Sequence, residues 1–183
     1  MQESLQLRPN HTWKAKPGYA ICVLDRGAVH FAYPNDWILK EDKQGYLSFF
    51  DIEPPKDNCN FSISVFHTPP ADWSELPLRI LVDHASPAED DDPGTTRGEI
   101  VEQKQAGFEI AWFEKMRWEE DGGTPREVCS RVLLARGAAV HSLITFNVWK
   151  DRWDRFAHVW RDLVDSLVLE WYVQDPTRGP VKQ

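Results

Sequence analysis

A carboxylate, a guanidinium and a hydroxyl group form the one polar constellation whose spacing suggests a shared site: Glu114, Arg131 and Ser142. If the chain reverses at Asp121–Thr124, Glu114 faces Arg131 across two antiparallel strands. A second, two-residue turn at Arg136–Gly137 then places Ser142 beside Arg131. A few polar groups on an otherwise apolar face are typical of small-molecule sites. The interpretation we favour is a structural ion pair, and ligand binding by this row is the alternative.

The register of the first hairpin rests on opposite charges. With the loop at Asp121–Thr124, Glu109 faces Arg136 and Glu119 faces Arg126. Opposite charges across an antiparallel pair contribute about 0.2–1 kcal/mol each, and a slip by one residue would exchange the two faces of the sheet. We therefore predict a three-stranded meander over residues 108–148. The neighbours of the polar row on its face are then apolar: Trp112, Met116, Cys129, Leu133, Val140 and Ile144.

Common catalytic and cofactor-binding motifs do not occur in the sequence. There is no GxSxG, Walker A, GxGxxG or HExxH pattern, and the three cysteines have no CxxC spacing. Cys129 is expected to be buried beside Met116, where a thiol is inert. The acidic run Glu89–Asp92 lacks the oxygen spacing of an EF-hand and is interpreted as a solvated loop. We predict no catalytic residues, no metal site and no cofactor, and enzyme activity stays open but is not favoured.

Charge and composition restrict the partners. The 183 residues carry a formal net charge of −8, and no segment concentrates lysine and arginine. Such a surface repels the phosphates of nucleic acids and of anionic membranes, so neither is an expected partner. The first residues contain no apolar run of the kind that a signal peptide needs. We therefore expect a cytoplasmic protein.

The elements that carry these residues are mostly strands. Short links between consecutive strands indicate antiparallel pairing, because a parallel crossover needs a dozen or more residues. Two helices are expected, one over about residues 75–84 with Ser74 as its cap. The other carries an apolar stripe in steps of three and four: Trp149, Trp153, Phe156, Trp160, Leu163 and Leu167. The prediction is an α+β fold with an N-terminal arm (1–18), a single domain (19–173) and a polar C-terminal tail (174–183).

Two segments carry a resemblance to a known family. The run from Val29 to Trp37 has a strand that ends in a Tyr-Pro-x-x-Trp corner, and Phe156–Leu169 looks like a closing helix followed by a Ser-Leu-x-Leu strand. Both are similar to segments of the Mog1/PsbP-like family, including its bacterial members of unknown function. The resemblance implies an antiparallel sheet sandwiched by helices. It implies no site residues, because characterised members are binding or assembly factors with different partners.

Two functions remain open. The first is a non-enzymatic protein-interaction module, which follows from the missing catalytic motifs and from the resemblance. The second is a small-molecule binder or unrecognised hydrolase that uses a pocket at Glu114, Arg131 and Ser142. An exposed apolar surface would favour the first function. A concave pocket at the polar row would favour the second.

Overall fold

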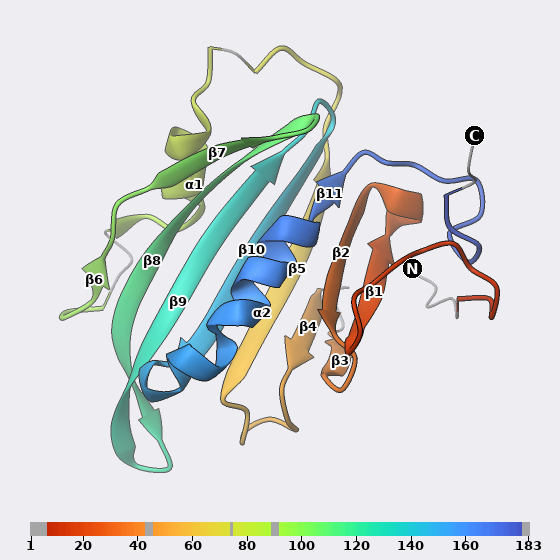
Figure 1. Cartoon of the computed structure of the whole chain (residues 1–183). Coiled ribbons are helices and arrows are strands. Elements are labelled where there is room, and N and C mark those ends of the chain that lie inside the picture. The colour runs from red at the N-terminus through yellow and green to blue at the C-terminus, as the bar shows by residue number, and fades with distance from the viewer. Residues whose placement is uncertain (1–6, 43–45, 74, 89–91, 181–183) are drawn as a thin grey trace.

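The computed structural model describes residues 7–42, 46–73, 75–88 and 92–180, which form two antiparallel sheets and two helices (Figure 1). The acidic residues 89–91 and Ser74 lie outside the described residues. The α+β class is confirmed. In spatial order the larger sheet contains β3 (Ile38–Glu41), β4 (Leu47–Phe50), β5 (Cys59–His67), β10 (Val140–Trp149), β9 (Thr124–Arg136), β8 (Phe108–Asp121) and β6 (Thr96–Arg97), with β7 (Val101–Gln105) also pairing with β8.

The predicted register of the β8–β9 hairpin is confirmed. Glu114 pairs with Arg131 and Met116 with Cys129, and Asp121 and Thr124 flank the tight turn. Gly122 and Gly123 have φ values of 59° and 86°, a region that glycine adopts without steric cost. Local turn chemistry and cross-strand charges therefore determine this pairing.

The predicted register of the β9–β10 hairpin is wrong. Arg131 pairs with Phe146, and Ser142 pairs with Ala135, so Ser142 is displaced from Arg131 by four residues along the strand, about 13 Å. The turn is longer than predicted because the carboxylate of Glu170 lies inside it and accepts bonds from three successive amides, those of Ala138, Ala139 and Val140.

Gly137 completes this turn. A Cβ atom there would lie 2.7 Å from Cδ of Glu170, so any other residue would require the carboxylate to shift. Glu170 itself adopts φ of 59°, outside the strand region. The distant C-terminal segment thus determines where β10 begins.

The helices cover opposite faces of the larger sheet, as the predicted sandwich requires. Helix α2 (Trp153–Ser166), after a short 3₁₀ turn at Lys150–Arg152, packs its apolar stripe into the main core. Helix α1 (Leu78–Ala85) begins later than predicted, after Pro77, and packs on the other face. That second core consists of Leu78, Val82, Ala111, Phe113, Val132 and Leu134.

A smaller sheet lies beside α2 on the same face of the larger sheet (Figure 1). Its order is β1 (Tyr19–Leu24), β2 (Val29–Pro34) and β11 (Val168–Leu169), with a 3₁₀ turn at Asp25–Gly27 between β1 and β2. Phe31 of β2 packs edge-on against Phe49 and Phe61 of the larger sheet, at ring-centroid distances of 5.6 and 5.9 Å. This aromatic cluster joins the two sheets. Strand β11 lies within the closing Ser-Leu-x-Leu segment that the resemblance indicates, and neither β6 nor β7 is predicted from the sequence.

Candidate functional site

The structure brings Glu114 and Arg131 together. Nε and Nη2 of Arg131 donate to the same oxygen, Oε2 of Glu114, at 3.0 and 2.9 Å. The guanidinium carbon of Arg131 lies 4.7, 4.1 and 5.2 Å from the ring centres of three tryptophans: Trp112, Trp153 and Trp160. Two of these rings belong to α2, so the arginine connects that helix to the sheet through cation–π contacts. This geometry accounts for the pair as a structural clamp.

Ser142 does not join this pair. It is fully buried between Ala135 and Val65, and its Oγ has no hydrogen-bond partner within the described residues. Cys129 is buried beside Met116 as predicted, and burial, followed by the nearby Glu114 carboxylate, raises the pKa of its thiol to about 12. Ligand binding by Glu114 and Arg131 stays a prediction. Ser142 is not a neighbour of this pair and cannot contribute to the same site.

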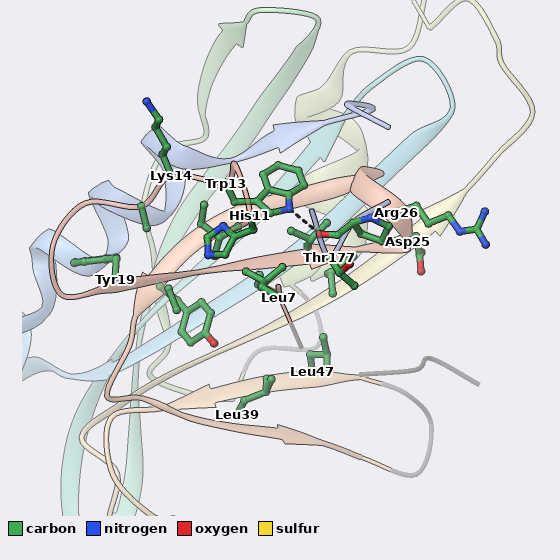
Figure 2. A pocket seen from close by; sticks show the side chains of 18 of the residues that line it. Leu7, His11, Trp13, Lys14, Tyr19, Asp25, Arg26, Leu39, Leu47 and Thr177 are labelled. Carbon is green, nitrogen blue, oxygen red and sulfur yellow. Dashed lines mark hydrogen bonds between the residues drawn. The ribbon is translucent and has the colours of Figure 1, made fainter. Parts of the chain in front are cut away.

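A hollow lies beside β1, away from Glu114 and Arg131. This hollow of about 1530 Å³ is bounded by the N-terminal arm, β1, the β3–β4 hairpin and the C-terminal tail. Figure 2 shows it with Trp13, His11 and Thr177 on one side of β1 and with Leu39 and Leu47 of the hairpin on the other. Pockets for small molecules usually hold about 300–1,000 Å³. The hollow is large enough for a segment of polypeptide.

Strand β1 contributes all of its residues to the lining. Its pairing with β2 divides them between two faces. Cys22 lies opposite Phe31, on the face that joins the main core, whereas Ile21 lies opposite Ala32, on the face covered by the arm. Since both faces and the edge between them line the hollow, β1 projects its outer edge into it.

The outer edge of β1 has no strand partner among the described residues. The amide of Asn35 donates to the carbonyl of Gly18. Because hydrogen-bonded residues alternate along an antiparallel strand, every second residue after Gly18, beginning with Ala20, also bonds to β2. Ala32, opposite Ile21, donates instead to Oγ of Ser166, which agrees with this alternation. The N–H and C=O groups of Ile21 and Val23 therefore point outward. In the part of the chain that the structure describes, no strand pairs with this edge.

Polar contacts hold the walls of the hollow. Nε1 of Trp13 donates to the carbonyl of Pro176 at 2.8 Å, the bond drawn in Figure 2, and so joins the arm to the tail. At the start of β1, the Tyr19 hydroxyl donates to Oδ2 of Asp162 in α2, and Lys16 forms an ion pair with the same carboxylate. Burial would raise the pKa of Asp162, but these two partners outweigh it and lower the pKa. The carboxylate stays ionised and keeps the arm attached to α2.

The lining of the hollow includes the thiol of Cys22. Burial raises the pKa of the Cys22 thiol to about 12, so the thiol stays protonated at neutral pH, whereas the thiolate is the nucleophile. Within the described ranges, no three His, Cys, Asp or Glu side chains lie close enough to hold a metal ion. Among the helices described, none has the length and apolar character to cross a membrane.

No prediction from the sequence covers the hollow. The signal was present, because β1 (Tyr-Ala-Ile-Cys-Val-Leu) contains no charged residue, proline or glycine. A strand of this kind is usually covered on both edges. The sequence does not show which strands lie beside β1 in the sheet. Its open edge therefore could not be predicted from the sequence.

The chain is similar over nearly its whole length to a protein family and to one of its members. The Alr1449 family model matches residues 20–173. The uncharacterised protein alr1449 of Nostoc sp. strain PCC 7120 is 36% identical over 180 residues, which cover 98% of this chain and 92% of that protein.

Solved structures show the same fold at low identity. Cyanobacterial PsbP (CyanoP) of Synechocystis sp. PCC 6803 has a TM-score of 0.52 and 18% identity, over 85% of this chain and 95% of that one. The Ran-binding protein Mog1p of Saccharomyces cerevisiae has a TM-score of 0.52 and 12% identity, over 82% and 95%. A Bacteroides thetaiotaomicron protein has a TM-score of 0.57 and 16% identity over 84% of this chain, which spans about half, 49%, of that protein. The Mog1/PsbP-like fold is confirmed.

Proposed function

This chain belongs to the Alr1449 family, and from that premise we propose that it is a protein-binding module whose binding site is the hollow beside β1. The observation that carries the proposal is the open edge of β1 inside a hollow of about 1530 Å³. Surfaces that expose apolar groups within a polar rim are typical of protein-interaction sites. Leu39 of the β3–β4 hairpin, which lines the hollow, is 44% exposed.

The fold neighbours support a binding role as a class of function. Mog1p is described as a Ran-binding protein, and that partner belongs to Mog1p. Identities of 12–18% transfer no partner, because unrelated functions are built on the same fold. The partner of this chain is therefore to be identified through the hollow itself.

Site-specific photo-cross-linking in cells of the organism that encodes the protein tests the proposal. A photoreactive phenylalanine derivative replaces Leu39 in the hollow, and the matched control replaces Ile80 on α1, which is 42% exposed. We expect a discrete adduct with another protein from position 39 and none from position 80. A second substitution in the hollow, Leu7→Glu, should abolish the adduct.

Two results would contradict the proposal. Equal adducts from both positions would mean that the hollow is not selective. An adduct from position 39 that persists unchanged with Leu7→Glu would mean that the partner contacts the hairpin from outside. In either case the hollow is not the binding site.

A further inference from the structure

We propose that the partner binds by strand addition, with an extended segment lying along the outer edge of β1 as a fourth strand of the small sheet. The inference rests on the proposed function of the hollow and specifies how the site recognises its partner. In this mode, main-chain hydrogen bonds supply affinity and alternate side chains supply specificity.

The backbone groups for this pairing are in place. Ile21 and Val23 direct N–H and C=O groups into the hollow, while the groups of Ala20 and Cys22 are bonded to β2. A new strand would lie about 4.8 Å from β1 and follow its six residues for about 20 Å. The added segment therefore needs only an extended backbone to satisfy these groups.

Other open edges in the described structure are protected and β1 is not. β3 is short and carries Lys40 and Glu41, and β7 carries Glu102 and Lys104. Charged residues and short length are the usual means by which proteins prevent edge strands from pairing. β6 and β11 have only two residues each. β1 has neither form of protection, which is typical of a strand that receives a partner.

The occupant is a single extended segment and not the sheet of a second copy. The edge of β1 is recessed between the arm and tail on one side and the β3–β4 hairpin on the other (Figure 2). The edge of a second folded copy would carry the same flanking walls, and these would collide before the two strands reached pairing distance. A terminus or linker of another protein has no such walls and can enter.

The two walls define the side chains that the segment should carry. Alternate residues of the segment would face Leu39 and Leu47 of the hairpin on one side and Trp13 of the arm on the other. These side chains are apolar, although charged residues such as Glu41 and Asp175 also line the hollow. A segment with apolar residues at the positions that face Leu39 and Trp13 fits this arrangement. We expect such a pattern in the bound sequence.

The first experiment uses a display library of random linear 12-residue peptides, selected on the full chain. Selected peptides should be apolar at alternate positions, and their binding should be resolved by amide hydrogen exchange measured by NMR. Strand addition slows exchange at Ile21 and Val23 at least tenfold. The amides of Ala20 and Cys22, already bonded to β2, should change little.

A backbone substitution gives a second, independent measurement. Ile21→Pro removes an amide that points outward, so the β1–β2 bonds survive, since proline is tolerated on edge strands when its missing N–H faces away from the sheet. We expect it to reduce peptide affinity at least tenfold. The matched control, Ile21→Val, keeps both the amide and the branched side chain and should bind as the wild type does. Circular dichroism confirms that both variants are folded.

The inference and the proposed function can fail separately. A peptide that binds in the hollow without protecting Ile21 and Val23, or that binds folded Ile21→Pro as tightly as Ile21→Val, overturns strand addition and leaves the hollow as a binding site. A selection that yields no peptide at the hollow also overturns strand addition. A homodimer in solution that protects the same two amides would overturn the choice of occupant. Absence of any position-39 adduct in cells, in the protein that carries no other substitution, refutes the proposed function itself.

Discussion

Replacing Glu170 tests the cause of the β9–β10 register. Glu170→Ala removes the acceptor of three amides, those of Ala138, Ala139 and Val140. The three amides differ in exposure. Val140 is fully buried, Ala139 half-buried and Ala138 exposed. Water can replace the carboxylate for the exposed amide, but not for the buried one.

The expected loss follows from these exposures. A buried donor left without a partner costs about 1–3 kcal/mol, and the half-buried amide adds a smaller amount. We therefore expect Glu170→Ala to lower the free energy of unfolding by about 2–4 kcal/mol. Glu170→Gln keeps an oxygen that can accept two of the bonds, and its loss should be about 1 kcal/mol.

Urea unfolding followed by tryptophan fluorescence measures both losses. The control is Glu120→Ala, an exposed glutamate at the far end of β8, whose removal should change the free energy of unfolding by less than about 0.5 kcal/mol. If Glu170→Ala behaves like Glu120→Ala, the carboxylate does not hold the turn. Our explanation of the register would then be wrong.

Three further predictions concern the core and the arm. Arg131→Lys should lower the free energy of unfolding by about 1–2 kcal/mol in urea titrations, because an ammonium cannot both stack on the tryptophans and make two bonds to Glu114; no change would refute the clamp. Ser142→Ala should leave the melting temperature unchanged or raise it, because the buried hydroxyl has no described partner; a clear decrease would contradict this. Burial lowers the pKa of His30, beside Trp13, from 6.5 to about 4. As the pH falls, His30 is therefore protonated in the unfolded chain before it is protonated in the folded protein. The free energy of unfolding should be unaffected by His30 above pH 6.5 and should fall by up to about 3 kcal/mol as the pH decreases toward 4. Urea titrations of His30→Leu should lack this decrease, and an identical pH dependence in variant and wild type would contradict the prediction.

The β8–β9 hairpin shows where sequence reasoning succeeds. Its turn contains two glycines, and two of its opposing charges form ion pairs across the strands, Glu109 with Arg136 and Glu114 with Arg131. Glu119 lies opposite Arg126, as predicted, but forms its ion pair with Arg117. Every interaction that defines this register lies within the hairpin itself. The pairing of Glu114 with Arg131 was therefore predictable from local information.

The next hairpin shows where the same reasoning fails. A two-residue turn at Arg136–Gly137 was a reasonable reading of the local sequence, but the carboxylate that lengthens the turn comes from Glu170, more than thirty residues later. Because that contact exists only after β11 has joined β2, no local pattern reveals it. Ser142 was assigned to the wrong row for this reason.

The α+β class, the amphipathic stripe of α2 and the uncharged character of β1 can be predicted locally, because they depend on side-chain type and short-range spacing. Which edge of β1 stays open, and which walls surround it, depends instead on how distant segments pack. The arm, the β3–β4 hairpin and the tail reach β1 through contacts between distant segments, such as Trp13 with Pro176 and Lys16 with Asp162. A hollow made of several segments exists only once the chain has folded, so its position is a property of the fold.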